Sequence, residues 1–312
     1  MSNALPQRVR IATRESRLAL RQSEMVADAL RERHPGLAVE LVGMTTKGDR
    51  VLDRPLAQVG GKGLFVKELE NALDEDRADI AVHSLKDVPM VIEPRFSIST
   101  FGPREDPFDA FCSGRHASLE AMPAGSVVGT SSLRRECQLR SRHPRLQFRA
   151  LRGNVNTRLA KLDAGEYDAI ILAVAGLKRL GFEARIRARL EEAIPAIGQG
   201  ILGVEHLAGR EDIARLLAPF EGRDPACAAQ AERALGLVVE GSCEVPVGAL
   251  ARVDGNSLRI DAFIGLPDGT RIVRDQAAGP CGDAASIGTA LGNRLLEAGG
   301  REILRLLARQ PA

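Results

Sequence analysis

Early in the chain stands the sequence Asp79-Ile80-Ala81-Val82-His83-Ser84-Leu85-Lys86-Asp87-Val88-Pro89, which predicts a buried β-strand ending in serine, lysine and aspartate before a proline. Short apolar runs of the same kind alternate with segments of helical periodicity from residue 9 to 101, and again from about 108 to 200. Such alternation is typical of α/β units around a largely parallel sheet. Its recurrence predicts two similar α/β domains.

The pattern changes at about residue 222. A helix over 226–239 is predicted, followed by alternating strands that are interrupted at Asp254-Gly255 and at Pro267-Asp268-Gly269. Glycine turns between alternating strands are typical of an antiparallel meander. Helices near 283–298 and 300–309 follow. The sequence therefore predicts a smaller C-terminal α+β domain.

Composition narrows the class of protein. The 312 residues suffice for two domains, or three small ones, and 43 basic against 41 acidic residues leave a net charge of +2. This balance creates no global field that would attract nucleic acid, an anionic membrane or an acidic partner. Nine Phe, one Tyr and no Trp provide few platforms for stacking single-stranded bases. The cations are 37 Arg and 6 Lys, and arginine suits bidentate binding of carboxylate or phosphate.

The cysteines indicate neither a disulfide framework nor a metal site. They are odd in number, widely spaced and contain no CxxC pair; their positions are Cys112, Cys137, Cys227, Cys243 and Cys281. The amino terminus lacks an apolar core of signal-peptide length, and no apolar run reaches the roughly 18 residues of a membrane span. We therefore expect a soluble cytoplasmic protein without a metal.

Two segments lead from a strand through hydroxyl residues into a helix, namely Ile11–Ser16 and Val128–Arg135. Each predicts either an anion site at a helix N-terminus or an ordinary N-cap. One such segment in each domain favours a ligand, because paired domains usually bind in the cleft between them. Residues 134–158 add eight arginines and one acid, which indicates either an anionic ligand or a basic surface. We expect Arg140, Arg142 and Arg145 to be solvated.

Three other features each permit two interpretations. Lys86 and Asp87, at the carboxyl end of the predicted strand, form either a site or a surface ion pair, and His83 is expected to be a core histidine. The run Gly60-Gly61-Lys62-Gly63 lacks the spacing of a phosphate-binding loop and is more typical of a mobile lid. Cys243, in a loop after small residues, is either a small buried residue or a reactive thiol.

Glu232-Arg233 is followed by Gly241-Ser242-Cys243-Glu244-Val245-Pro246-Val247-Gly248. These residues match the cofactor-attachment signature of the porphobilinogen deaminase family, also called the hydroxymethylbilane synthases, and the chain resembles this family. Further motifs follow the family's order: Ile11-Ala12-Thr13-Arg14, Val59-Gly60-Gly61-Lys62-Gly63-Leu64-Phe65, His83-Ser84-Leu85-Lys86-Asp87-Val88-Pro89, Gly129-Thr130-Ser131-Ser132-Leu133-Arg134-Arg135 and Leu151-Arg152-Gly153-Asn154. Arg21 departs from the family, which commonly has an aromatic there.

This resemblance implies a transferase of haem and tetrapyrrole biosynthesis. Such an enzyme joins four porphobilinogen molecules head to tail, releases ammonia each time, and hydrolytically releases the linear tetrapyrrole hydroxymethylbilane. A dipyrromethane cofactor is the primer to which the substrate is added. The resemblance implies that a thioether links it to Cys243, since a thiolate attacks electron-poor methylenes. Asp87 matches the catalytic carboxylate, which would stabilise the cations formed at each addition.

Matching residue by residue implies the rest of the site, because each pyrrole carries an acetate and a propionate. Matched to the cofactor are Ser84, Lys86, Thr130, Ser131, Ser132, Arg134, Arg135 and Arg158. Matched to the substrate are Arg14, Ser16, Gln22, Arg152, Gly153 and Gln199. Lys62 and Phe65 belong to the expected lid.

The family's first two domains resemble the two-lobed periplasmic binding-protein fold, between whose lobes the chain crosses twice. The implied fold is α/β, with two such lobes and a smaller C-terminal α+β domain that has a three-stranded antiparallel sheet. The expected domains are residues 1–102 with 201–219, residues 103–200, and residues 220–312, which carry Cys243. Hinge motion near 100–107 and 194–201 would move the lobes past a fixed Asp87.

The implied partner is the small molecule porphobilinogen, with neither nucleic acid nor membrane. We expect a monomer that passes its product to the next enzyme of the pathway. A solute-binding module for a small carboxylated ligand would also account for two lobes and many arginines. It would not account for Cys243 on a third domain or for Asp87 facing the cleft, and a covalent adduct distinguishes the two classes.

Overall fold

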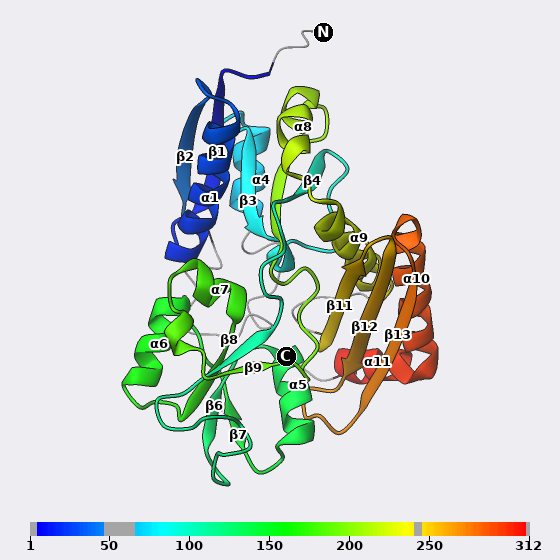
Figure 1. Ribbon diagram of the computed structural model, residues 1–312. Coiled ribbons are helices and arrows are strands. Elements are labelled where there is room, and N and C mark those ends of the chain that lie inside the picture. The colour runs from blue at the N-terminus through cyan, green and yellow to red at the C-terminus, as the bar shows by residue number, and fades with distance from the viewer. Residues whose placement is uncertain (1–4, 47–65, 240–244, 310–312) are drawn as a thin grey trace.

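The computed structural model describes residues 5–46, 66–239 and 245–309, which form three sheets with helices packed against them (Figure 1). Two mixed five-stranded sheets form two α/β lobes, one above the other in Figure 1, and a three-stranded antiparallel sheet lies beside them. The predicted fold class is confirmed. Within these ranges, no helix has the length and apolar character needed to cross a membrane.

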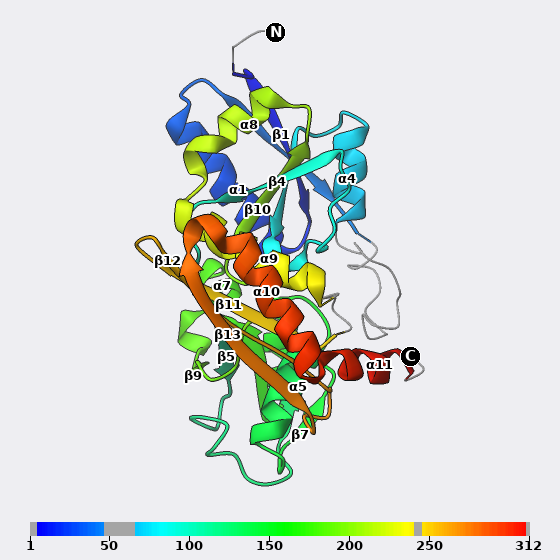
Figure 2. The same ribbon diagram turned by 90° about the vertical axis from the view of Figure 1, so that its right-hand side faces the viewer.

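The first sheet, in lobe 1, has the strand order β2-β1-β3-β10-β4. Its strands are β1 (Arg8–Arg14), β2 (Ala38–Met44), β3 (Ile80–Ser84), β4 (Phe96–Phe101) and β10 (Leu202–Leu207). Its helices are α1 (Arg17–Arg33), α4 (Lys67–Asp74) and α8 (Glu211–Leu217). Figure 2 shows α4 on one face of the sheet and α1 and α8 on the other. The apolar positions of α1 recur at helical spacing, so Val26 and Leu30 pack together against Val9 and Ile11.

The second sheet, in lobe 2, has the order β7-β6-β8-β5-β9. Its strands are β5 (Asp109–Cys112), β6 (Val127–Gly129), β7 (Gln147–Arg149), β8 (Ala169–Ala173) and β9 (Ala188–Leu190). Its helices are α5 (Leu133–Arg142), α6 (Val155–Asp163) and α7 (Val174–Arg179). The strand predicted over 146–151 is thus shorter than expected, because β7 pairs with the three residues of β6.

In the described part of each lobe, the antiparallel strand occupies the fourth position in the sheet. β10 runs antiparallel to β3 and β4, and β5 runs antiparallel to β8 and β9. The chain enters each of these strands directly after crossing from the other lobe. Sequence periodicity predicted neither of them. The two lobes therefore share one topology, and in each sheet the fourth strand directly follows a crossover from the other lobe.

The two crossover segments, residues 102–108 and 191–201, lie against each other. The N–H of Glu105 donates to the carbonyl oxygen of Gly200 at 3.1 Å. Gly200 has a φ of +91°, and a Cβ at this position would overlap the Glu105 carbonyl oxygen. Glycine is needed here for both its positive φ and its lack of a side chain.

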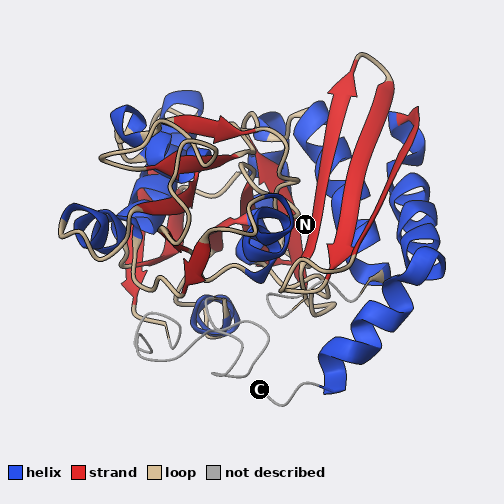
Figure 3. Cartoon of the chain, turned by 90° about the horizontal axis from the view of Figure 1, so that it is seen from below, coloured by secondary structure: helices blue, strands red, loops and turns tan. Residues whose placement is uncertain are grey.

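The C-terminal part consists of one sheet and the helices packed against it. The strands are β11 (Val247–Asp254), β12 (Ser257–Gly265) and β13 (Ile272–Pro280), and the helices are α9 (Arg223–Val238), α10 (Ala284–Leu295) and α11 (Arg301–Arg309). Figure 3 shows these three long strands side by side, with helices along them. Leu235 of α9 and Leu291 of α10 share one buried cluster with Ile260 of the sheet. The predicted antiparallel meander is confirmed, and Gly255 forms the first turn with a φ of +57°.

The buried carboxylate of Glu232, on α9, joins the C-terminal part to both crossover segments. It accepts hydrogen bonds from Arg104 Nη1 at 2.6 Å, from the Gly198 N–H at 2.7 Å and from the Ala251 N–H at 2.8 Å. Arg104 also donates to the Gln199 carbonyl oxygen at 2.9 Å. One side chain therefore holds α9, β11 and the two crossovers together.

We predict that Glu232→Gln lowers the free energy of unfolding by about 3 kcal/mol or more, since it leaves the largely buried Arg104 guanidinium without its counterion. Denaturant unfolding followed by circular dichroism measures the loss. The control is Glu211→Gln, because the Glu211 side chain is 74% exposed and lies 3.8 Å from Arg215; this change should leave the midpoint where it is. Equal midpoints for the two variants would contradict the role given to Glu232.

Candidate active site between the lobes

The lobe 1 side of the site is the carboxyl end of β3. Buried Leu85 anchors the 3-10 turn Leu85–Asp87, whose last residue keeps an exposed side chain. A cavity of about 40 Å³ lies beside this turn, and its polar lining includes Arg14, Ser16, Gln22, Ser84 and Asp87. Gln22 Nε2 donates to Ser84 Oγ at 2.7 Å, which fixes both side chains at this wall.

The lobe 2 side is the start of α5. Ser132 is the N-cap residue, and its own N–H donates to Thr130 Oγ1 at 3.2 Å. Ser131 Oγ donates to the Leu151 carbonyl oxygen at 2.8 Å, which holds this segment against the end of the next strand. Ser16 likewise caps α1 in lobe 1. Both segments are therefore N-caps, and their binding of an anion stays a prediction.

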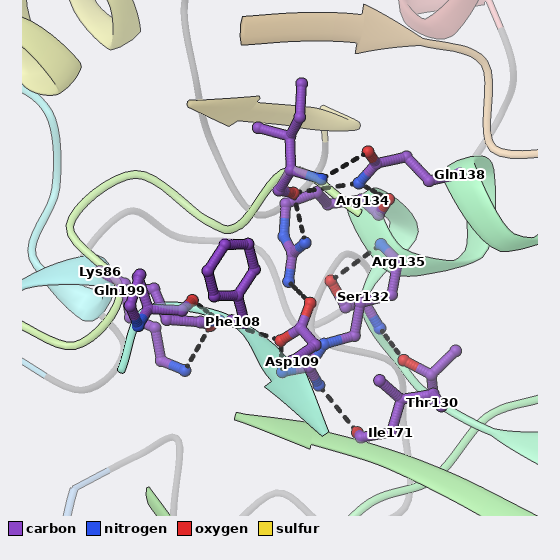
Figure 4. Close-up of polar contacts among 12 residues, drawn as sticks. Lys86, Phe108, Asp109, Thr130, Ser132, Arg134, Arg135, Gln138, Ile171 and Gln199 are labelled. Atoms are coloured by element: carbon purple, nitrogen blue, oxygen red, sulfur yellow. Dashed lines mark hydrogen bonds and ion pairs between the residues drawn. The ribbon is translucent and has the colours of Figure 1, made fainter. Parts of the chain in front are cut away.

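A buried carboxylate, Asp109, lies at the centre of the polar contacts in Figure 4. Its Oδ2 accepts from Arg134 Nη2 at 2.7 Å, and its Oδ1 accepts from Arg135 Nη2 at 2.7 Å and from Gln199 Nε2 at 2.9 Å. Burial alone would raise the pKa of Asp109, but the two guanidinium groups hold it well below its usual range. Asp109 is thus a fixed negative charge.

Lys86 reaches from lobe 1 to the same network. Its Nζ donates to Gln199 Oε1 at 3.1 Å. Burial lowers the pKa of Lys86 to about 8; Asp87 and Asp109 oppose this shift, whereas Arg135 and Arg134 add to it. The side chain is therefore a cation below pH 8 and loses its charge as the pH rises through that value.

Arg158, on α6, contributes a further cation. Its Nε donates to the Gly153 carbonyl oxygen at 2.7 Å. Burial lowers the pKa of Arg158 to about 10, with Arg135 and Arg152 acting in the same direction and Asp87 against it. These electrostatic interactions place Asp87 of lobe 1 and the arginines of lobe 2 around one region.

The structure brings most of the predicted site residues to these two facing sides. On the lobe 1 side lie Arg14, Ser16, Gln22, Ser84, Lys86 and Asp87. On the lobe 2 side and the second crossover lie Thr130, Ser131, Ser132, Arg134, Arg135, Arg152, Gly153, Arg158 and Gln199. Lys62, Phe65 and Cys243 lie outside the described residues.

Sequence reasoning missed Asp109. It stands at the start of an unpredicted strand, 25 and 26 residues from the arginines that it binds. The available clue was the single acid among eight arginines over 134–158, because buried guanidinium groups need a carboxylate from elsewhere.

Two of the plainer interpretations are confirmed. His83 is a core histidine whose Nε2 lies 3.0 Å from buried Glu205 Oε2. Arg142 and Arg145 are exposed as expected, whereas Arg140 is half-buried, pairs with Glu136 at 2.7 Å and lies over the Phe148 ring.

The charges of the site suit a ligand with several carboxylates, as the implied dipyrromethane would be. The cations Lys86, Arg134, Arg135 and Arg158 exceed the carboxylates Asp87 and Asp109 by two. Arg135 Nε is buried and has no hydrogen-bond partner among the residues that the structure describes. A donor of this kind is left for a ligand, since buried polar groups otherwise find partners.

Comparison with known proteins agrees with this ligand chemistry. The family model "Porphobilinogen deaminase, dipyromethane cofactor binding domain" matches residues 9–215, and "Porphobilinogen deaminase, C-terminal domain" matches residues 226–297. A porphobilinogen deaminase of Burkholderia thailandensis is 54% identical over 308 residues, which are 97% of this chain and 94% of that protein.

Solved structures show more distant likenesses. The methionine binding protein MetQ covers 69% of this chain and 90% of its own, at 13% identity and a TM-score of 0.45. The periplasmic aliphatic sulphonate binding protein SsuA from Escherichia coli covers 77% of this chain and 72% of its own, at 10% identity and a TM-score of 0.42.

The two lobes bring a carboxylate and a surplus of cations together, which is the arrangement expected of a protein that binds an acidic small molecule. Both family models match, and together they extend from residue 9 to residue 297 with one short gap. The chain belongs to the porphobilinogen deaminase family, and it is a transferase with a dipyrromethane cofactor binding domain.

We predict that Lys86 is acylated at lower pH than Lys178. Burial keeps its pKa near 8, whereas a hydrogen bond from Lys178 to Glu105 raises the pKa of Lys178 above its ordinary value. Competitive labelling of the Cys243→Ser variant, which should lack the covalent dipyrrole, with acetic anhydride from pH 6 to 11 and peptide mass spectrometry measures both midpoints in one sample. A Lys86 midpoint at or above that of Lys178 would contradict the electrostatics of the site.

Proposed function

We propose that this chain is a hydroxymethylbilane synthase in which Asp87 is the catalytic carboxylate. The observation that carries the proposal is the placement of exposed Asp87 directly after Lys86, whose Nζ donates to Gln199 in the network that holds the buried arginines of lobe 2. Substrate carboxylates bound by those cations would hold the pyrrole ring beside Asp87.

Asp87 has a chemical role that an anion in this position can perform. Loss of ammonia breaks the carbon–nitrogen bond of the porphobilinogen aminomethyl group and leaves positive charge on the pyrrole. The Asp87 carboxylate stabilises that charge, and it accepts the pyrrole N–H in a hydrogen bond that strengthens as the charge develops. It also provides a place for the proton that the accepting pyrrole carbon loses when the new carbon–carbon bond forms.

The cations orient the ligand and take no part in bond formation. Lys86, Arg135 and Arg158 would bind acetate and propionate groups, helped by the hydroxyls of Ser84 and Thr130. When bound through the Cys243 thioether, the dipyrromethane supplies the free pyrrole position that the first substrate molecule joins. Arg14 and Arg152 would bind the substrate's own carboxylates, and Gln22 and Gln199 would fix neighbouring side chains.

The lobes, the assembly and the setting of the enzyme are part of the same proposal. We assign residues 1–102 with 201–219 to domain 1, residues 103–200 to domain 2 and residues 220–312 to domain 3, which agrees with the membership of the three sheets. No step above needs a second chain, so the enzyme would act as a monomer. We place it in the cytoplasm. Its product would pass to the next enzyme of the pathway.

We predict that the purified protein is heavier than its sequence mass by one covalent dipyrrole. Intact-mass measurement should find this adduct in the wild type and lose it in Cys243→Ser, because the thioether needs that sulfur. Cys281→Ser is the matched control and should keep the adduct, since the Cys281 side chain is buried in the C-terminal core. An unmodified wild-type chain would favour the solute-binding module instead.

We predict that Asp87→Asn reduces turnover of porphobilinogen by at least about 100-fold, since the amide keeps the shape and removes the charge that stabilises the transition state. Ammonia release and product absorbance measure the loss, while circular dichroism and the melting temperature should match the wild type. Asp28→Asn, on the exposed face of α1, is the control and should keep full turnover. Retention of most activity by Asp87→Asn would overturn the assignment.

A further inference from the structure

The buried carboxylate of Asp109 binds two arginines of lobe 2 directly, and it is connected to Lys86 of lobe 1 through Gln199. We propose that Asp109 is a positioning residue: it holds the guanidinium groups of Arg134 and Arg135 and, through Gln199, the ammonium group of Lys86 where they bind the carboxylates of the pyrrole ligand. This inference rests on the proposed function and adds a residue to it.

The hydrogen bonds of Asp109 fix the orientation of the Arg134 and Arg135 guanidinium groups as well as their distance from the carboxylate. Each arginine gives Asp109 one Nη2 donor at 2.7 Å and gives a backbone carbonyl its Nη1 donor. The carbonyls belong to Ile194, at 2.7 Å from Arg134, and to Ile171, at 2.9 Å from Arg135. A guanidinium group held at both ends cannot rotate, so the direction of the remaining Arg135 Nε is set by Asp109.

The place of Asp109 in the chain explains why it can connect the lobes. It is the first residue of β5, directly after the first crossover segment, while Gln199 lies on the second. Gln199 Nε2 donates to Asp109 and to the Pro107 carbonyl oxygen at 2.7 Å, which leaves its Oε1 to accept from Lys86. Lys86 precedes Asp87 in the chain. Asp109 is therefore connected through the side chain of Gln199 to Lys86, the neighbour of the catalytic carboxylate Asp87.

Charge supports the same role. The groups that act on Lys86 are the carboxylates Asp87 and Asp109 and the guanidinium groups of Arg134 and Arg135. The two carboxylates raise the pKa of Lys86 towards its ordinary value, and the two arginines lower it. Loss of the Asp109 charge would leave two buried guanidinium groups together and would lower the pKa of Lys86 further.

A second buried carboxylate provides a matched comparison. Asp79 accepts from Arg10 Nε at 3.0 Å and from Arg210 Nη1 at 3.2 Å, and its side chain is 8% exposed. It precedes β3, so it lies at the end of that strand opposite to Asp87. Asp79→Asn therefore removes a buried charge from two arginines at a distance from the site, although these arginines are more exposed than Arg134 and Arg135 and keep Asp76 and Asp212 as partners.

The experiment compares Asp109→Asn, Asp109→Glu and Asp79→Asn in the purified full-length protein for turnover, and in the Cys243→Ser background, which should lack the dipyrrole, for acylation of Lys86. Asp109→Asn should lower kcat/KM for porphobilinogen by about 100-fold, because the binding cations are misplaced, and should lower the pH midpoint for acylation of Lys86. Asp109→Glu keeps the charge but moves it by one methylene, so kcat/KM should fall while the Lys86 midpoint stays near the wild-type value. Asp79→Asn should reduce the melting temperature and leave both other quantities unchanged.

The outcomes separate this inference from the proposed function. If both Asp109 variants keep kcat/KM within twofold of Asp79→Asn, Asp109 is only a stabilising residue and the proposal is wrong. It is wrong too if neither Asp109 variant folds, and if only Asp109→Asn fails to fold, Asp109→Glu decides. An inactive wild type without an adduct would refute the proposed function instead, and the Lys86 midpoint in Asp109→Asn would then decide whether Asp109 holds the network.

Discussion

The close approach of the two crossover segments is the constraint on which the relative position of the lobes depends. Gly200 permits it, since any side chain at that position would overlap the Glu105 carbonyl oxygen. Glu232 then holds both segments from the side of the C-terminal part, and Asp109 with Gln199 holds them from the side of the site. Each lobe also depends on the crossovers for its fourth strand. The relative position of the lobes and the position of the site therefore both depend on the junction of the two crossover segments.

The chemistry follows from how charge is distributed across this junction. The net charge of the chain is only +2, yet the described part of the site holds two carboxylates of different character beside the cations Arg14, Lys86, Arg134, Arg135, Arg152 and Arg158. Asp109 is buried and fully engaged by its donors, whereas Asp87 is exposed at the end of β3. One carboxylate thus organises the cations, and the other remains open to a reacting pyrrole. A near-neutral protein can in this way bind a ligand that carries many carboxylates.

Sequence patterns predicted the elements whose structure is local. The strands over 38–44 and 96–101 match β2 and β4, because apolar alternation between turn residues defines them without reference to a partner. β5 and β10 were missed, since each becomes a strand through pairing with segments far away in the chain. For the same reason the partner of Arg134 and Arg135 could not be identified. The family motifs supplied site residues, but the internal carboxylate that holds two of them became visible only in three dimensions.

The central claim is that cations of both lobes hold carboxylated pyrroles while Asp87 promotes their stepwise addition to a covalently attached primer. Native mass spectrometry of the wild-type enzyme, mixed with limiting porphobilinogen, tests this most directly. The account predicts a ladder of enzyme-bound species, each heavier than the last by one porphobilinogen less ammonia, which ends at four additions. Porphobilinogen that binds as an intact molecule, retains its nitrogen and dissociates on dilution would contradict it.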